Sequence, residues 1–193
     1  MRWICVYCGS KEGVKPEYRQ AAQQLGKTMV EQGLGLVYGG GSVGLMGAVS
    51  DAVLEAGGKV RGVIPRGLAT KEAMHPGVED MHVVTDMHAR KALLQDLADV
   101  FVTLPGGFGT LEEIAEVLSW SQLGLHGKPI GLLNIAGYFD ALVTFIGHAV
   151  GEGFIKSQYA ELLLVNDRPE KLLTDLLNYE LPAHHKFHAN SPA

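Results

Sequence analysis

Three glycine-rich segments are the first part of the sequence that could do chemistry. They read CGSKEG at 8–13, YGGGSVGLMG at 38–47 and LPGGFGTLEE at 104–113, and each follows a short apolar run. Glycines after a strand allow backbone N–H groups to approach a ligand closely, and the N-terminus of a following helix favours an anion. Three such turns at one edge of a sheet would support one another. The pattern therefore predicts a phosphorylated ligand.

The second segment also fits the dinucleotide fingerprint G-x-G-x-x-G, through Gly39, Gly41 and Gly44. That fingerprint needs an acidic residue about 20 residues later to bind the ribose hydroxyls. The next strand-like run, KVRGVIP at 59–65, contains no acid. A nicotinamide oxidoreductase is therefore disfavoured. The sequence also has no G-x-x-x-x-G-K-[ST] to indicate an ATP-type phosphate loop.

An arginine begins an apolar helical stripe. Asp86 is placed to cap a helix that runs to about Leu97, in which Arg90 and the leucines at 93, 94 and 97 follow the spacing i, i+3, i+4, i+7. A guanidinium turned toward a core needs an anionic partner, because burying it unpaired costs several kcal/mol. Two interpretations stay open. One is a structural salt bridge or a side chain that reaches solvent; the other is a ligand clamp.

Two adjacent glutamates follow the third glycine segment. Thr110 and Glu113 fit a capping box at the start of a helix predicted over 110–123. Its apolar stripe is predicted at positions 111, 114, 115 and 118, so the glutamates at 112, 113 and 116 lie off it. Two interpretations stay open. Either the glutamates cap the helix and are otherwise solvated, or they face the ligand. A carboxylate would repel phosphate, but it would stabilise a sugar carbon that develops positive charge.

The chain alternates between strand-like and helical patterns from end to end. Strands are predicted at 2–8, 34–40, 59–65, 81–85, 99–105, 128–134 and 162–166. Helices are predicted at 16–31, 45–56, 86–97, 110–123, 138–151 and 168–179. The alternation predicts one α/β domain over 1–180, with a doubly wound, mostly parallel, Rossmann-like sheet and helices on both faces. Ligands bind such sheets at the carboxyl ends of the strands. Residues 181–193 lack periodicity and are expected to form a disordered tail.

Composition excludes several classes of protein. The 193 residues are 47% hydrophobic and 19% charged, which is typical of a soluble globular chain. A net charge of −5 gives no general attraction to nucleic acid polymers or anionic membranes, and no apolar run is long enough to span a bilayer. A cytoplasmic location is expected. The eight histidines show no metal-ligand spacing, so we expect no catalytic metal.

The two cysteines, Cys5 and Cys8, form a C-x-x-C inside a strand-like run. A redox motif of this kind normally opens a helix. In a strand the period of two turns these positions to opposite faces of the sheet. We therefore interpret them as small hydrophobic residues of a buried strand.

The residues PGGFGTLEE at 105–113, MHARK at 87–91 and YGGGSVGLMG at 38–47 resemble the LOG family. Its members are cytokinin riboside 5′-monophosphate phosphoribohydrolases, often labelled lysine decarboxylase-like. The family motif P-G-G-x-G-T-x-x-E is matched in full, and CGS at 8–10 matches the family's first strand end. The resemblance covers roughly 2–180. It implies hydrolysis of the N-glycosidic bond of an N6-modified AMP to free base and ribose 5-phosphate, no cofactor, and a homodimer with sites near the subunit interface.

The resemblance also implies roles for individual residues. Arg90 and Glu113 would be the catalytic pair. Glu113 would stabilise the oxocarbenium-like transition state or orient the attacking water, and Arg90 would position Glu113 and the ribose. The phosphate would be held by Gly107, Gly109 and Thr110, with Ser10 and Gly41 nearby. The other implied substrate contacts are Glu72, Met87, Lys91, Gly106, Phe108, Leu111, Glu112 and Ser119.

Two further alternatives have to be weighed. A non-catalytic nucleotide-binding or sensor protein on the same scaffold is the main one, although phosphate capture alone does not require both Arg90 and Glu113. A decarboxylase would need a lysine that binds pyridoxal phosphate, and the sequence has no lysine in a distinctive Schiff-base context. The preferred base stays open between isopentenyladenine, another N6-substituted adenine and adenine itself.

Overall fold

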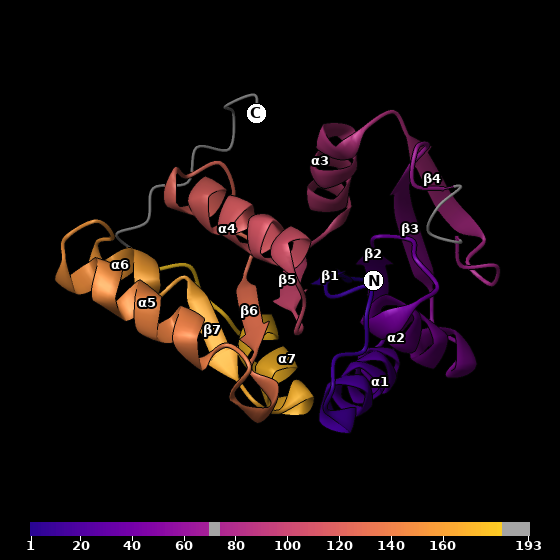
Figure 1. Cartoon of the computed structure of the whole chain (residues 1–193), viewed down its shortest axis with the longest axis horizontal. Coiled ribbons are helices and arrows are strands. Elements are labelled where there is room, and N and C mark those ends of the chain that lie inside the picture. The colour runs from indigo at the N-terminus through magenta and orange to yellow at the C-terminus, as the bar shows by residue number, and fades with distance from the viewer. Residues whose placement is uncertain (70–73, 183–193) are drawn as a thin grey trace.

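The computed structural model describes residues 1–69 and 74–182, which form one seven-stranded sheet flanked by helices (Figure 1). The strands are β1 (Trp3–Tyr7), β2 (Gly35–Tyr38), β3 (Val60–Pro65), β4 (Asp80–Val84), β5 (Val100–Thr103), β6 (Ile130–Leu133) and β7 (Leu163–Asn166). The helices are α1 (Pro16–Glu31), α2 (Gly44–Glu55), α3 (Met87–Leu97), α4 (Phe108–Gln122), the 3-10 turn η1 (Ile135–Gly137), α5 (Asp140–Gly151), α6 (Ser157–Ala160) and α7 (Pro169–Leu177). Residues 183–193 of the predicted disordered tail lie outside the described residues.

All seven strands are parallel and lie in the order β4-β3-β2-β1-β5-β6-β7. The chain builds outward from β1 to β4 on one side, returns to β5 beside β1, and then builds outward to β7. This confirms the predicted doubly wound α/β fold, with every strand parallel. The direction of winding reverses between β1 and β5, so their carboxyl ends form the switch point at which such sheets bind ligands.

Helices cover both faces of the sheet (Figure 1). The core on one face includes residues of α1, α2 and α7, and the core on the other includes residues of α3 and α4. Cys5 belongs to the second core and Cys8 to the first, and both thiols are free and buried. The prediction that the two cysteines face opposite ways is therefore confirmed. None of the helices within the described ranges is long and apolar enough to cross a membrane.

The first turn of α4 differs from the prediction. The helix begins at Phe108 with Gly107 as its N-cap, and no side chain caps it. The predicted capping box of Thr110 and Glu113 is therefore wrong, since Thr110 is already the third residue of the helix and is buried. Glycine is itself an acceptable N-cap, so the glycine turn starts the helix earlier than the polar signal indicates. No described side chain therefore binds the first N–H groups of α4.

The face of α4 that packs on the sheet also differs from the prediction. The buried positions are Thr110, Ile114, Val117 and Ser121, whereas Leu111 is 38% exposed. Of the predicted stripe, only position 114 is buried, while 115 is exposed and 118 is half-buried. Both faces repeat at helical spacing, so periodicity alone could not choose between them. An apolar side of α4 is consequently left at the surface.

Candidate active site

The three glycine-rich turns meet at the carboxyl ends of β1, β2 and β5. Gly9 N–H donates to the Pro105 carbonyl oxygen over 3.0 Å, and Leu45 N–H donates to the Gly9 carbonyl oxygen over 3.1 Å. Gly44 has a φ of 63°, and a Cβ there would lie 2.3 Å from the Lys11 nitrogen. Only glycine allows the turns to approach this closely.

A cavity of about 270 Å³ lies between the first turn of α3 and the N-terminus of α4. Its walls are Cys8, Gly9, Ser10, Met46, Met87, Arg90, Gly107, Phe108, Gly109, Thr110, Glu112 and Glu113. Most of the residues predicted from the sequence therefore share one cavity. A Cβ added to Gly107 or Gly109 would meet nothing within 4 Å, so the start of α4 is open to a ligand.

Arg90 reaches this cavity from the first turn of α3. The Asp86 carboxylate caps the helix by accepting from Ala89 N–H over 2.9 Å. The Arg90 side chain is only 8% exposed, so it does not extend into solvent. Its Nη2 donates to the Gly39 carbonyl oxygen over 3.4 Å, and its Nε has no partner among the described residues. It also forms no ion pair within 4 Å to a described carboxylate. This geometry favours the ligand clamp over the structural salt bridge.

Glu113 lines the same cavity from the second turn of α4. Burial raises the pKa of its carboxyl from 4.5 to about 7; the positive charge of Arg90 opposes the rise, and Glu112 adds to it. A carboxyl that titrates near neutral pH inside a cavity is typical of catalytic acids and bases. The interpretation of Glu113 as a solvated surface acid is not supported.

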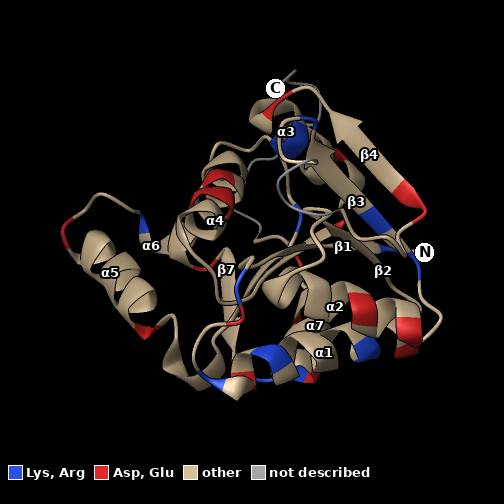
Figure 2. Ribbon diagram, turned by 45° about the vertical axis from the view of Figure 1, so that its right-hand side comes forward, with Lys and Arg blue, Asp and Glu red and all other residues tan. Residues whose placement is uncertain are grey.

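Lys91 does not line the cavity but bridges α3 and α4 beside it. Its Nζ lies 2.9 Å from an oxygen of Glu112 and 2.7 Å from an oxygen of Glu116. Figure 2 shows the basic residues of α3 across from the acidic residues of α4. Hydrogen bonds to Glu116 and Glu112 raise the pKa of Lys91. Two of the predicted substrate contacts, Lys91 and Glu112, therefore bind each other and hold the two helices together.

The structure places four other predicted residues away from this cavity. Gly41 is buried and forms an isolated antiparallel bridge. Gly106 lines a neighbouring cavity. Leu111 and Ser119 line an apolar cavity between α4, α5 and α6. Glu72 lies outside the described residues. In the part of the chain that is described, no three His, Cys, Asp or Glu side chains are arranged to hold a metal ion.

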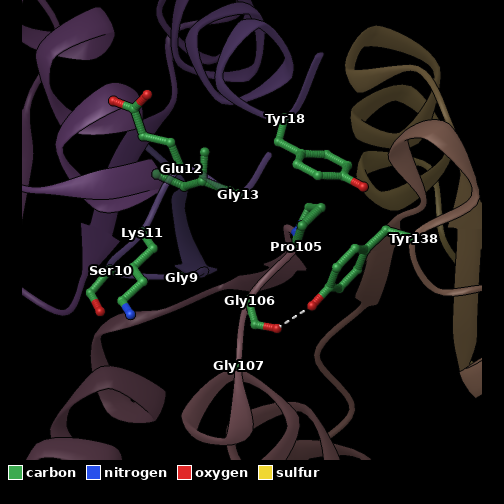
Figure 3. Close-up of a pocket in the computed structure, with 11 residues that line it drawn as sticks. Gly9, Ser10, Lys11, Glu12, Gly13, Tyr18, Pro105, Gly106, Gly107 and Tyr138 are labelled. Carbon is green, nitrogen blue, oxygen red and sulfur yellow. Dashed lines mark hydrogen bonds between the residues drawn. The ribbon is translucent and has the colours of Figure 1, made fainter. Parts of the chain in front are cut away.

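The neighbouring cavity, of about 410 Å³, shares Gly9, Ser10 and Gly107 with the first. In Figure 3 the turn after β1 forms one side of it, and Tyr18 and Tyr138 form the other. The Tyr138 hydroxyl donates to the Gly106 carbonyl oxygen over 2.6 Å. The two cavities therefore meet at the glycine turns.

Sequence reasoning missed several residues of these cavities. Cys8, Gly9 and Met46 stand inside the glycine-rich segments, so the segments themselves carried a signal for them. Tyr138 lies beyond β6, far from every motif. Only the folded chain brings it to Gly106, and no local pattern could have identified it.

The fold is similar to that of solved structures of other proteins. The molybdenum cofactor carrier protein of Chlamydomonas reinhardtii matches with a TM-score of 0.71 and 24% identity, covering 92% of this chain and 99% of that one. The molybdenum cofactor binding protein of Rippkaea orientalis matches with a TM-score of 0.69 and 24% identity, covering 92% of this chain and 98% of that one. At this identity the likeness concerns the fold alone.

Sequence relatives are considerably more similar. Residues 46–176 match the family described as "Possible lysine decarboxylase". Cytokinin riboside 5′-monophosphate phosphoribohydrolase LOG7 of Arabidopsis thaliana is 50% identical over 177 residues, which cover 92% of this chain and 82% of that protein. The protein named LOG of Oryza sativa subsp. japonica, with the same enzyme name, is 49% identical over 178 residues, which cover 92% of this chain and 74% of the relative. The chain belongs to the LOG family, the family that its glycine, arginine and glutamate motifs resemble.

Proposed function

We propose that this protein is a phosphoribohydrolase that cleaves the N-glycosidic bond of N6-modified adenosine 5′-monophosphates and so takes part in cytokinin biosynthesis. Water adds its oxygen to the anomeric carbon, the bond to the base breaks, and a proton from the water ends on the released base. The observation that carries this proposal is the meeting of Arg90 and Glu113 in one cavity at the open N-terminus of α4. A cytoplasmic location is part of the proposal.

The start of α4 is the proposed phosphate site. Its first N–H groups have no partner inside the helix, and the helix dipole adds positive potential there. Gly107 and Gly109 leave the space in front of these groups open. Thr110 and Ser10 line the same space and supply hydroxyl groups. A phosphate bound here would fix the ribose relative to the side chains deeper in the cavity.

Glu113 and Arg90 are the proposed catalytic pair. As the base leaves, the anomeric carbon gains positive charge, and a nearby carboxylate stabilises that charge more in the transition state than in the ground state. Glu113 would also orient the attacking water. Arg90 would position Glu113 and the ribose. Its Nε is buried without a partner among the described residues, and its positive charge lowers the Glu113 pKa and so favours the ionised form.

The two alternatives account for fewer of these features. A pyridoxal phosphate decarboxylase needs a lysine that loses its proton readily. Lys91, which lies beside the cavity, has a raised pKa and contacts two carboxylates. A sensor that only captures a nucleotide has no need of a buried carboxyl with a pKa near 7 in the cavity.

The exposed apolar side of α4 supports a homodimer as part of the proposal. With α5 and α6 it forms a cavity of about 360 Å³ whose lining includes Leu111, Leu118 and Phe145, and Phe145 is 63% exposed. Contiguous apolar surface of this kind marks interfaces. Because Glu113 lies on the same helix, a second subunit here would stand close to the active site.

Sedimentation tests the dimer. We expect the wild type at twice the chain mass of 20.7 kDa and Phe145→Glu at the mass of one chain. Val14→Glu is the matched control, since Val14 is 97% exposed but lies on the loop before α1. A wild type that sediments as a single chain would rule the dimer out.

Base release tests the reaction. Isopentenyladenosine monophosphate and AMP are incubated separately with wild type and with Glu113→Gln, and the free base is measured by chromatography. We expect base from the wild type and a rate lower by at least about 10²-fold from the variant, the scale of a lost positioned catalytic group. The ratio of the two wild-type rates ranks the substrates. Nucleotide binding without base release from either substrate would favour the sensor.

A further inference from the structure

A hydrogen bond ties the glycine turn after β5 to a distant part of the chain. The Tyr138 hydroxyl donates to the Gly106 carbonyl oxygen over 2.6 Å, across 32 residues of sequence (Figure 3). Tyr138 follows η1 and does not line the cavity that holds Arg90 and Glu113. The turn at the proposed phosphate site is therefore held from outside that site.

The peptide unit that accepts this hydrogen bond joins two glycines. Glycines rotate with little steric resistance, so a peptide between them can turn over easily. Packing requires glycine at the first position, because a Cβ on Gly106 would lie 2.1 Å from Thr110 Oγ1 and 2.8 Å from Gly9 N. The close approach of the turns after β1 and β5 thus requires glycine at position 106, and a glycine does not by itself fix the orientation of the peptide that follows it.

The orientation of this peptide matters for an anion. All described peptide bonds are trans, and in a trans peptide the C=O and N–H groups point in opposite directions. Tyr138 holds the Gly106 oxygen on its own side, so the Gly107 N–H points away from Tyr138. If the peptide turned over, a carbonyl oxygen would replace that donor and would repel a phosphate.

Tyr138 is 43% exposed, but aromatic contacts and a closed turn position it. Its ring packs edge-on against Tyr18, with centroids 5.6 Å apart, and against Phe139 at 4.8 Å. The Asn134 side chain accepts from Phe139 N–H over 2.7 Å and so closes the turn that carries Tyr138. Ala136 in this turn has a φ of 52°, a left-handed conformation that a non-glycine residue keeps only when its surroundings enforce it.

We propose that Tyr138 is a positioning residue for phosphate recognition, whose hydroxyl fixes the Gly106–Gly107 peptide with its N–H toward the phosphate. This deepens the proposed function and rests on it for the identity of the nucleotide. Tyr138 does not touch the reacting atoms; it acts through the turn.

Tyr138→Phe tests the role because it removes the hydroxyl and keeps the ring packing. We expect inhibition by inorganic phosphate and by ribose 5-phosphate to weaken by about 3- to 10-fold, the effect of one hydrogen bond. The KM for isopentenyladenosine monophosphate should rise by a similar factor, with inhibition by adenine unchanged and the melting temperature lowered by no more than about 2–4 °C, the cost of one hydrogen bond. Tyr18→Phe is the control. Tyr18 lines the neighbouring 410 Å³ cavity together with Tyr138, but its hydroxyl forms no hydrogen bond to another described residue.

Equal weakening of phosphate and adenine inhibition would overturn the proposal, because it would indicate general loosening of the site. Unchanged phosphate inhibition would overturn it as well. Calorimetric titration with inorganic phosphate needs no turnover, so it separates this inference from the proposed reaction. Weaker phosphate binding by Tyr138→Phe than by the wild type supports the positioning role of Tyr138 even if the wild type releases no base. Equal phosphate binding by the two proteins refutes that role, whichever nucleotide is the substrate.

Discussion

Gly39 lies against the Arg90 guanidinium, and Gly39→Ala would therefore move that guanidinium with a single methyl group. A Cβ at Gly39 would lie 2.0 Å from Arg90 Nη2, so the nitrogen must retreat by about 1.5 Å to reach an ordinary contact distance. Met46 Sδ, at 3.2 Å, must give by a few tenths of an ångström. Gly39 is not among the glycines with positive φ, so its backbone accepts alanine.

Displacing a catalytic group by about 1 Å costs on the order of 10² in rate. We expect Gly39→Ala to lower kcat/KM for base release by about that factor, or about 2.7 kcal/mol of transition-state stabilisation. Stability should change little, because the end of a flexible side chain moves aside easily. The melting temperature should stay within about 3 °C of the wild type. Gly151→Ala is the control, since Gly151 ends α5 and a Cβ there meets nothing within 4 Å.

A double variant shows whether the effect runs through Arg90. If it does, Gly39→Ala combined with Arg90→Ala should be no slower than Arg90→Ala alone, because the two changes remove the same interaction. Wild-type kcat/KM in Gly39→Ala would refute the role given to the position of Arg90. A fall in melting temperature of more than about 10 °C would refute the argument that the guanidinium moves easily.

Three further predictions concern Glu113 and the cap of α3. Because the Glu113 pKa is raised to about 7, kcat/KM should fall about tenfold per pH unit below that value. Between pH 4.5 and about 7 the Glu113 carboxyl is protonated in the folded state but ionised in the unfolded state, so the stability of the wild type falls as pH rises through this range. Glu113→Gln should therefore be more stable than the wild type above pH 7, by up to about 3 kcal/mol in denaturant unfolding. Below pH 4.5 the two proteins should be equally stable. Asp86→Ala removes the cap on Ala89 N–H and should cost about 1 kcal/mol, or about 2–4 °C in melting temperature; no loss would refute the cap.

The fold could be predicted largely from the sequence. Seven apolar runs separated by helical patterns correspond to the seven strands, and parallel strands joined by helices leave few ways to order them. The face of α4 could not be predicted. Leu111 and Leu118 repeat at helical spacing as regularly as Ile114 and Val117, and contact with the sheet decides which pair is buried.

For the site, the sequence by itself determined the kinds of chemistry available. Glycines after strands indicated an anion, and the apolar stripe that begins with Arg90 placed an arginine toward the core without deciding whether its guanidinium reaches solvent; the structure buries it. The protonation state of Glu113 depends on the tertiary structure, because burial between α3 and α4 raises its pKa and the spacing of residues in the sequence does not reveal how deeply a side chain is buried. Tyr138 likewise meets Gly106 only because β5 and β6 are neighbours in the sheet. Residue types and local spacing are properties of the chain, whereas desolvation and long-range contact arise only when distant segments pack together.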